Sequence, residues 1–425
     1  MAGTEPKNES IDRRVRLDPT NAWTAVATLF SAFALAVVPP YVKAQQPAEA
    51  NQGDAVINIK MLYLEEYQER PPALSNIFPR PEDQGEQGAH LGVADSNTTG
   101  RFLRQRYDMS VSRVANQRAA LQSARSSVDA GLAFILANVS ADTALTLARD
   151  SSISGKAVIF NLGSTEDQLR ATQCTTGLLH TIPSRAMLTD ALAQFLIRRK
   201  WQKWLLLTGP QEADKAWVNA INRSAKRFGG KITDERTWSF NTDLRRTAQQ
   251  ELPLFTQARS YDVVLVADEI GDVGEYVSYN TWLPRPVAGT QGLVPVGWHR
   301  VLEQWGARQL QNRFQEQAGR TMNDVDYAAW VAVRAIAEAV TRSKSTQPAA
   351  VYRYLLSDDF ELAAFKGRSL SFRSWNGQLR QPIPLVQPRA MVSQSPQEGF
   401  LHPQTELDTL GYDVQETNCS FEKSL

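Results

Sequence analysis

The stretch from Cys174 to Pro210, CTTGLLHTIPSRAMLTDALAQFLIRRKWQKWLLLTGP, decides the fold of this chain. Residues 177–182 are mostly apolar, as in a short buried strand, and Pro183 ends them because proline has no N–H for a sheet ladder. Ser184 then stands where a helix N-cap belongs, and the apolar residues that follow recur at three- and four-residue steps. A second buried strand follows at residues 204–207. This order of strand, proline hinge, helix and strand predicts the first crossing between two lobes.

Predicted strands and helices alternate on both sides of this stretch, a pattern typical of parallel sheets with right-handed crossovers. Strands are expected before it at 56–64, 107–114, 132–136 and 156–160, and after it at 231–238, 263–267 and 292–296. We therefore predict an α/β fold with two lobes, each a mostly parallel doubly wound sheet.

Each lobe is expected to use two separate parts of the chain. The first lobe is assigned residues 45–182 plus 297–365, and the second, with the C-terminal tail, 183–296 plus 366–425. A helix is expected at 299–318. Residues 370–373 and 384–392 are expected to form a hairpin with Asn376-Gly377 between them.

Length and charge exclude some classes of protein. The chain has 425 residues, which favours two or more domains. Its 46 Lys and Arg balance 45 Asp and Glu, whereas a nucleic-acid-binding protein usually carries a basic patch, so no nucleic-acid partner is expected. An apolar fraction of 42% is ample for packed cores, so the chain is not of the disordered class.

The first 44 residues have the pattern of a signal peptide. Arg13, Arg14 and Arg16 form a basic region, and the apolar stretch 22–38 is about 17 residues long, short for a membrane span. Small or compact residues up to Ala44 predict cleavage after it and export to the periplasm. A retained membrane anchor is the alternative, and the paired arginines leave a twin-arginine signal open beside the general secretory one. No cysteine lies near the cleavage point, which excludes a lipoprotein.

Cys174 and Cys419 are the two cysteines of the chain. An oxidising compartment would let them pair, and neither lies in a metal or redox spacing such as C-x-x-C. The alternative is two separate buried thiols. A disulfide would tie the end of the chain to the region of the first crossing.

Catalytic and metal-binding motifs are missing from the sequence. It has no G-x-S-x-G, Walker, H-E-x-x-H or G-x-G-x-x-G pattern. The four histidines are scattered, and none has a second ligand at metal spacing: His90, His180, His299 and His402. We therefore expect a protein that is not an enzyme and that holds neither a metal nor a cofactor.

Polar residues follow several predicted strands at their carboxyl ends, where open α/β sheets bind ligands. They are Tyr63, Glu65, Asn138, Ser140, Asn161, Ser164, Asp268 and Glu269. Ser140 and Ser164 are placed to open helices, whose free N–H groups can hold an anion, and Asp268 or Glu269 would oppose a cationic group. The alternative for each residue is ordinary helix capping or solvated loop charge. Together they predict a ligand-binding cleft.

Six long strings resemble one family of binding proteins. They are DSNTTGRFL from Asp95, LLHTIPSRAMLTDAL from Leu178, PRPVAGTQGLVP from Pro284, EQWGARQLQNRF from Glu303, FRSWNGQLRQPI from Phe372 and GFLHPQTELDTLGYD from Gly399. From Val56 to Val392 the chain is similar to type I periplasmic solute-binding proteins, the leucine/isoleucine/valine-binding family. More narrowly, it resembles the ABC transporter substrate-binding proteins of PQQ-dependent alcohol dehydrogenase systems.

The resemblance implies a monomer that binds a small solute between its lobes and delivers it to the membrane permease of an ABC transporter. Members that bind branched-chain amino acids hold the ligand with a Ser/Thr-rich turn after the third strand. Here Ser140 matches that turn, whereas Asn138 and Val139 replace its other hydroxyls. Asp268 or Glu269 is the counterpart of the acid that meets the amino group. An amino acid, an alcohol-oxidation product, a cofactor and an aromatic acid are all left open as the solute.

Two other functions are left open as well. An accessory or sensory protein could use the same fold to act on a membrane partner without transport. An enzyme would need a nucleophile, metal or cofactor motif that this sequence lacks.

Overall fold

The computed structural model describes residues 56–69, 80–239, 244–271, 273–419, 421 and 425. The predicted signal peptide, residues 1–44, lies outside the described residues, as does the start of the predicted first lobe. In the part that is described, no helix is both long enough and apolar enough to span a bilayer.

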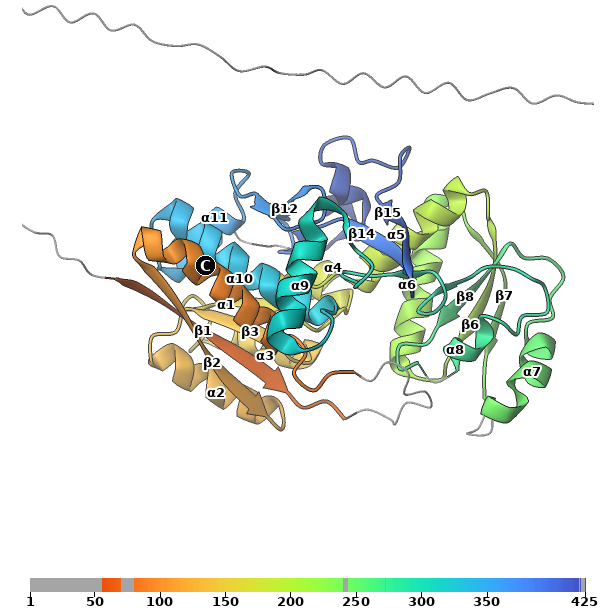
Figure 1. Ribbon diagram of the computed structural model, residues 1–425, viewed down its shortest axis with the longest axis horizontal. Helices are drawn as coiled ribbons and strands as arrows, with labels where there is room; N and C mark the ends of the chain where they lie inside the picture. The colour runs from red at the N-terminus through yellow and green to blue at the C-terminus, as the bar shows by residue number, and fades with distance from the viewer. Residues whose placement is uncertain (1–55, 70–79, 240–243, 272, 420, 422–424) are drawn as a thin grey trace, which may run out of the picture. The chain divides into compact units, whose positions relative to one another are not determined.

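Five parallel strands form the first sheet, in the order β2-β1-β3-β4-β5 (Figure 1). Their bounds are β1 (Ile57–Glu66), β2 (Gln105–Val114), β3 (Phe134–Asn138), β4 (Val158–Asn161) and β5 (Leu178–His180). The connections carry the helices α1 (Glu86–Leu103), α2 (Gln117–Asp129), α3 (Ala141–Arg149) and α4 (Gln168–Ala171). The strands expected before residue 182 are therefore confirmed, each within a few residues.

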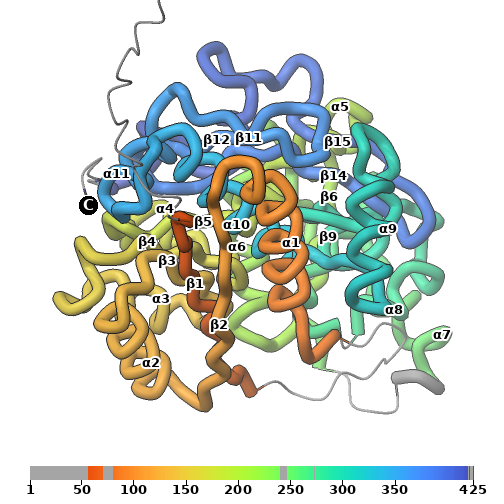
Figure 2. Tube along the Cα trace, turned by 60° about the vertical axis from the view of Figure 1, so that its left-hand side comes forward, coloured from red at the N-terminus to blue at the C-terminus, as the bar shows by residue number. Residues whose placement is uncertain are grey.

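Side chains of β1 alternate between two cores, as the two-residue period of a strand requires. Ile59 and Met61 pack on one side with α1 and with α10 (Asp324–Ser343). Leu62 and Leu64 pack on the other side with α2 and α3. Figure 2 shows these helix pairs on opposite sides of the sheet. The first sheet is thus buried on both faces, as in other doubly wound proteins.

Four parallel strands form the second sheet, in the order β7-β6-β8-β9. They are β6 (Lys203–Thr208), β7 (Lys231–Thr237), β8 (Val263–Ala267) and β9 (Val287–Gly289), of which the sequence prediction lacks β9. One face packs against α5 (Arg185–Arg198) and α6 (Glu212–Phe228). The other packs against α7 (Leu244–Phe255) and α8 (Gly274–Val277). The two sheets with their helices are called the first and second lobe below.

The chain returns to the core of the first lobe after the second sheet. The helices α9 (Ala307–Ala318), α10 and α11 (Pro348–Leu355) all contribute apolar side chains to it. The helix expected at 299–318 begins only at Ala307, after a 3₁₀ turn η1 (Gln304–Gly306). Trp305 and Gly306 have φ values of 55° and 81°, which an α-helix does not accommodate.

The expected hairpin of residues 370–373 with 384–392 is wrong. β12 (Ser369–Phe372) pairs with β11 (Leu362–Ala363) and β13 (Leu379–Arg380), whereas β14 (Ile383–Gln387) pairs with β10 (Val294–Pro295) and β15 (Ala390–Ser395). Gly377 has a φ of 67°, so the chain turns back there and its next residues complete a short hairpin. Leu379 belongs to the core of the first lobe and Ile383 to that of the second. The chain therefore crosses between lobes at the point where we expected one continuous strand pair.

Three segments that cross between the two cores lie side by side, after β5, β10 and β13. The Nε2 of Gln381 in the third donates to the carbonyl of Thr181 in the first at 2.8 Å. A Cβ on Gly297 in the second would lie 3.2 Å from the ring of Pro183. These contacts define a hinge of three chain segments. The stretch from Cys174 to Pro210 predicted the first of them.

A buried arginine fixes the place of the first crossing. Arg170 donates from Nη1 to the carbonyl of Ser164 at 2.9 Å, from Nη2 to that of Ile182 at 3.2 Å and from Nε to Gln378 Oε1 at 2.9 Å. The Nε2 of Gln378 in turn donates to the carbonyl of Ile182 at 3.1 Å. Burial lowers the pKa of Arg170 to about 9, against the opposing effect of Asp167.

A buried lysine lies beside the third crossing. The Nζ of Lys366 donates to Gln381 Oε1 at 2.5 Å and to the carbonyl of Pro382 at 3.2 Å, and it lies 4.7 Å from the ring centroid of Tyr327. Burial lowers the pKa of Lys366 to about 7, although the carboxyl of Asp324 acts in the opposite direction.

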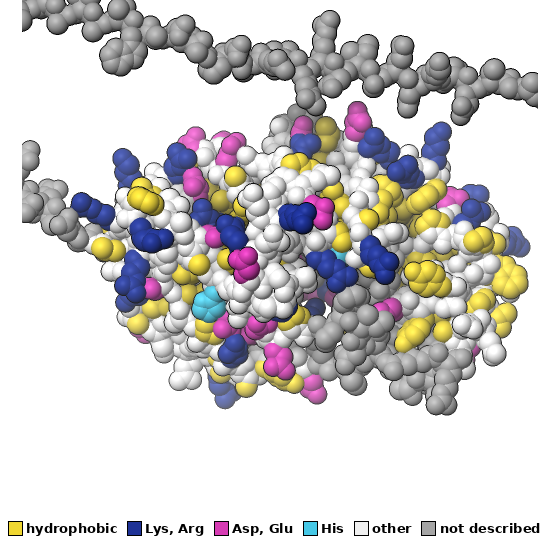
Figure 3. Space-filling view, in the orientation of Figure 1, with side chains coloured by type: hydrophobic (Ala, Val, Ile, Leu, Met, Phe, Trp, Pro, Cys, Tyr) yellow, Lys and Arg dark blue, Asp and Glu magenta, His cyan; other side chains and the backbone are white. Residues whose placement is uncertain are grey.

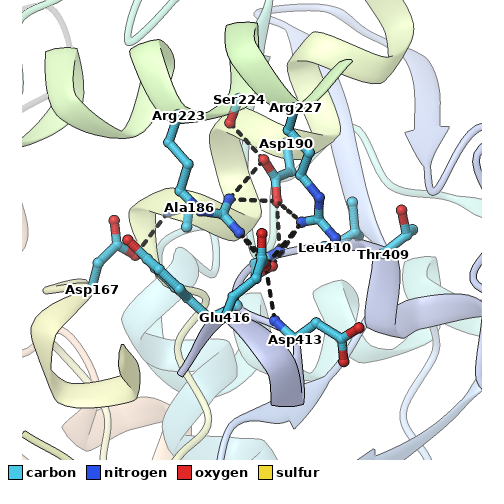
Figure 4. A network of polar contacts seen from close by, with 12 residues as sticks. Asp167, Ala186, Asp190, Arg223, Ser224, Arg227, Thr409, Leu410, Asp413 and Glu416 are labelled. Atoms are coloured by element: carbon cyan, nitrogen blue, oxygen red, sulfur yellow. Dashed lines mark hydrogen bonds and ion pairs between the residues drawn. The ribbon is translucent and has the colours of Figure 1, made fainter. Parts of the chain in front are cut away.

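The C-terminal tail is held on both lobes. In the second, the fully buried carboxylate of Asp190 accepts from Arg223 at 3.0 Å, from Arg227 at 2.8 Å and from the backbone N–H of Gly411 in the tail at 2.8 Å (Figure 4). Two short 3₁₀ turns belong to this tail, η2 (Glu406–Thr409) and η3 (Val414–Glu416).

In the first lobe, Cys419 forms a disulfide with Cys174, with Cα atoms 5.5 Å apart. The N–H of Asn418 donates to the carbonyl of Ala171 at 2.9 Å beside it. The expected pairing of the two cysteines is confirmed, and the tail spans from one lobe to the other.

The disulfide generates a first prediction. Cys419→Ser should lower the free energy of unfolding by about 2–4 kcal/mol, because the unfolded chain regains the freedom of a very long loop. Thermal unfolding under non-reducing conditions measures the change. A melting temperature equal to that of the wild type would show that the disulfide does not stabilise the tail. Cys174→Ser should give the same loss, since either change removes the same bond.

Lys366 generates a second prediction, on pH dependence. The amine of the unfolded chain titrates near pH 10.5, so between about pH 7 and pH 10.5 the unfolded chain binds more protons than the folded one. The free energy of unfolding should therefore rise with pH across this window, by up to roughly 1.4 kcal/mol per pH unit. Lys366→Met should flatten that rise in urea unfolding curves, and the exposed control Lys226→Met should keep it. Equal pH profiles in wild type and Lys366→Met would contradict the assignment.

Candidate functional site

The carboxyl ends of β1 and β3 meet at one edge of the first sheet, because parallel strands all end on the same side. A cavity of about 600 Å³ lies at this edge. Its lining includes three carboxylates, two guanidinium groups and three amides: Glu65, Glu66, Glu82, Arg80, Arg113, Gln68, Gln84 and Asn138. The cavity thus carries charges of both signs.

Tyr63, Glu65 and Asn138 lie together below this cavity in one hydrogen-bonded group. The Nδ2 of Asn138 donates to Tyr63 Oη at 3.2 Å and to Glu65 Oε1 at 3.3 Å. The Tyr63 hydroxyl donates to the carbonyl of Gln84 at 2.8 Å. Burial raises the pKa of Tyr63, and the neighbouring carboxyl of Glu65 adds to the rise. Tyr63 is fully enclosed, so it supports the side chains of Asn138 and Glu65 that reach the cavity.

Glu65 is partly withdrawn from water. Burial raises its pKa, which the guanidinium of Arg113 opposes. The Arg113 Nε lies 3.4 Å from Glu65 Oε2, and the same guanidinium also contacts the carboxylate of Glu86. Glu65 therefore shares its counter-charge with a second acid.

Ser140 caps α3, as the sequence predicts. Its Oγ accepts from the N–H of Thr143 at 3.3 Å. The carboxylate of Glu66 binds at the same helix end: it accepts from the Ser140 N–H, the Ser140 Oγ and the Thr143 Oγ1, each at 2.9 Å. Sequence reasoning missed Glu66. The signal for it is the strand period, because Glu66 falls on the same side of β1 as Leu62 and Leu64, which is the side of α3.

Asn161 and Ser164 form a turn of their own at the end of β4. The Asn161 Oδ1 accepts from the N–H of Ser164 at 2.9 Å, and its Nδ2 donates to the Ser164 carbonyl at 2.8 Å. The expectation that Ser164 opens a helix is wrong, since α4 begins at Gln168 after an N-cap at Asp167. The Asn161 side chain binds its own backbone instead of extending the chain into a helix at this point.

Asp268 and Glu269 follow β8 in the second lobe, as expected, and both bind inside the chain. The carboxylate of Asp268 accepts from the N–H groups of Gly271 at 2.9 Å and Gly274 at 2.7 Å. Glu269 accepts two hydrogen bonds from Arg185, at 2.6 Å from Nε and 2.8 Å from Nη2.

Arg185 joins the two lobes through carboxylates. It is 4% exposed, and its Nη1 lies 2.7 Å from an oxygen of Glu166, which follows β4 in the first lobe. Burial opposes the charge on Arg185, but Glu269 and Glu166 outweigh it and raise its pKa. The guanidinium is held as a cation between two acids, one from each lobe.

The structure thus groups the predicted residues in three places. Glu65, Glu66 and Asn138 line the cavity, while Tyr63 is bonded to Asn138 and Ser140 to Glu66. Asn161 and Ser164 lie in their own turn, and Asp268 and Glu269 lie in the second lobe. Among the residues that the structure describes, no cluster of His, Cys, Asp and Glu could hold a metal ion. The face drawn in Figure 3 carries basic and acidic side chains interspersed, in agreement with the balanced composition.

No family model matches the chain, and no curated protein matches it significantly. Solved structures do share its fold. A branched-chain amino acid ABC transporter periplasmic ligand-binding protein from Burkholderia xenovorans has a TM-score of 0.65 at 16% identity, over 86% of this chain and 99% of that one. The leucine-, isoleucine-, valine-, threonine- and alanine-binding protein from Brucella ovis, in a closed conformation, has a TM-score of 0.63 at 14% identity, over 86% and 99%.

A solute-binding protein of an ABC transporter from Rhodopseudomonas palustris, in complex with 3,4-dihydroxybenzoic acid, has a TM-score of 0.54 at 9% identity, over 78% of this chain and 93% of that one. At these identities the comparisons show the fold. It is the two-lobed type I periplasmic binding protein fold, with two mostly parallel α/β sheets.

The Arg185 cluster generates a third prediction. Glu269→Gln should lower the free energy of unfolding by about 1.5–3 kcal/mol, because it weakens two hydrogen bonds to an enclosed cation. The control Glu212→Gln removes the same charge from an exposed pair with Lys215 and should change stability little. Urea unfolding of the two variants measures the difference, and equal stabilities would refute a bridging role for Arg185.

Proposed function

We propose that this chain is the solute-binding component of an ABC transporter, and that it binds a small solute at the cavity edge of the first lobe. The observation that carries the proposal is the cavity at the carboxyl edge of the first sheet, which is lined by charges of both signs. In open α/β sheets this edge is where ligands bind. The similar solved structures include proteins described as ABC transporter substrate-binding proteins, one of them in complex with leucine.

The hinge supplies the physical basis for delivery. A solute that touches both lobes binds the closed form better than the open form and so shifts the balance between them. A membrane permease can then distinguish the loaded protein from the empty one by shape. In this proposal the protein works as a periplasmic monomer after removal of residues 1–44, and it carries out no catalysis.

The residues proposed for binding are those of the sequence prediction, with the cavity group Tyr63, Glu65, Asn138 and Ser140 nearest the solute. Asn161, Ser164, Asp268 and Glu269 complete the set when the lobes close. The six strings quoted above link the chain further to PQQ-dependent alcohol oxidation, so that alcohols and their oxidation products belong in any panel of solutes. The lobe boundaries assigned from the sequence at 182/183 and 296/297 are part of the same proposal, whereas the third, placed at 365/366, is moved to the crossing after β13.

The fourth prediction tests binding and closure together. Titration calorimetry should detect a solute within a panel of branched-chain amino acids, aromatic acids, and short or aromatic alcohols. X-ray scattering should show a smaller radius of gyration with that solute. Absence of both heat and compaction across the panel would refute the proposal.

A matched pair of variants locates the site. Asn138→Leu should weaken binding by about tenfold or more, roughly 1.4 kcal/mol, because it removes the amide that holds the Glu65 carboxylate at the cavity. Asn58→Leu, at the opposite end of the same sheet, should leave the affinity unchanged. Equal losses in both variants would place the solute elsewhere.

A further inference from the structure

The N-terminal end of α3 already holds a carboxylate, that of Glu66. Free N–H groups and the helix dipole attract anions to such an end. Here one N–H and two hydroxyls converge on the Glu66 carboxylate, each at 2.9 Å, and Glu66 also lines the cavity. A solute carboxylate could bind at this end of α3 only by displacing one that the chain itself supplies.

In the second lobe, the acid expected to meet a cationic group of the solute is also bonded within the chain. The Glu269 carboxylate, which would meet an ammonium group, accepts both of its short hydrogen bonds from Arg185. An α-amino acid would therefore find the predicted partner of its carboxylate and the predicted partner of its ammonium group both engaged within the chain.

The cavity instead offers hydrogen-bond acceptors. The Glu65 Oε2 is enclosed and accepts no hydrogen bond within the part of the chain that the structure describes, although Arg113 lies 3.4 Å away as an ion-pair partner. The other oxygen, Oε1, accepts only a long bond of 3.3 Å from Asn138. The Glu65 carboxylate thus lines the cavity with one long hydrogen bond and one ion-pair partner, so a solute hydroxyl or ammonium group that donates to it adds a charge-assisted hydrogen bond.

We propose that Glu66 is a specificity-determining residue: it fills the anion position at α3, so the solute carries no carboxylate there and presents hydrogen-bond donors to Glu65. This inference rests on the proposed function, since it takes the cavity to be the solute site. The solute class it names is that of alcohols and amines, and two experiments test it.

The first experiment is chemical rescue and needs no solute. Glu66→Ala vacates the end of α3, so its melting temperature should fall, and added formate should restore it in a saturable way. Equal concentrations of chloride should not. Formate should leave the wild type unchanged, and also Glu212→Ala, which removes an exposed carboxylate from the first turn of another helix.

Three outcomes would overturn the assignment of Glu66. In the first, formate stabilises the wild type as much as Glu66→Ala. In the second, Glu66→Ala is as stable as the wild type. In the third, Glu66→Ala is less stable, but formate does not restore its melting temperature.

The second experiment compares three probes with one aromatic skeleton: benzyl alcohol, benzylamine and benzoate. The wild type should bind the alcohol or the amine at least about tenfold more tightly than benzoate. Glu66→Ala should gain benzoate affinity by about tenfold or more, because the helix end becomes free. Glu65→Gln removes the negative charge of the acceptor. If the solute donates from an ammonium group, this variant should retain its affinity for benzyl alcohol and lose its affinity for benzylamine. If the solute donates from a hydroxyl, the affinities for both probes should change similarly.

The outcomes separate the two claims. Tight benzoate binding by the wild type, unchanged in Glu66→Ala, would overturn the inference and leave the proposed function standing. If none of the three probes binds the wild type and the wider panel also fails, the proposed function falls, and formate rescue then decides whether Glu66 fills the end of α3.

Discussion

The hinge of this protein depends on a buried positive charge, that of Arg170. A guanidinium cannot remain in an apolar interior unless its N–H groups are bonded, and here irregular backbone supplies most of the acceptors. The carbonyls of Ser164 and Ile182 and the side chain of Gln378 converge on it from the end of β4, the first crossing and β13. The path of the chain between the lobes is therefore set by the need to satisfy one side chain.

Local patterns predicted much of the fold. Strand β8 has the predicted bounds, and Ser140 and Ser184 cap the helices that follow them. Each of these features depends on residues within a few positions of one another: an apolar run, or a hydroxyl before a periodic helix. The alternation of strands and helices then limits the topology to few choices.

Pairings over long distances along the chain could not be predicted in this way. The β12–β13 hairpin and strand β14 follow one another within one short stretch of sequence. They belong to different lobes because Leu379 packs in the first core and Ile383 in the second. Glu269 reads as a free acid after a strand, but its partner Arg185 lies 84 residues earlier. Glu65 and Glu66 are neighbours in sequence and both line the cavity, yet the strand period turns only Glu66 toward α3. Candidate site residues were found by position, whereas their partners required the structure.

The tail that joins both lobes has a consequence for how the protein is made. Synthesis delivers the chain from its N-terminus, but Asp190 receives the N–H of Gly411 only after 221 further residues, and Cys174 meets Cys419 only after 245. Until then the carboxylate between α5 and α6 lacks one of its donors, and the first lobe still awaits α10 and α11 for its core. Completion of both lobes is thereby postponed to the end of synthesis. A prematurely terminated chain would lack these ties and part of the first core, and would offer proteases an unfinished fold to degrade.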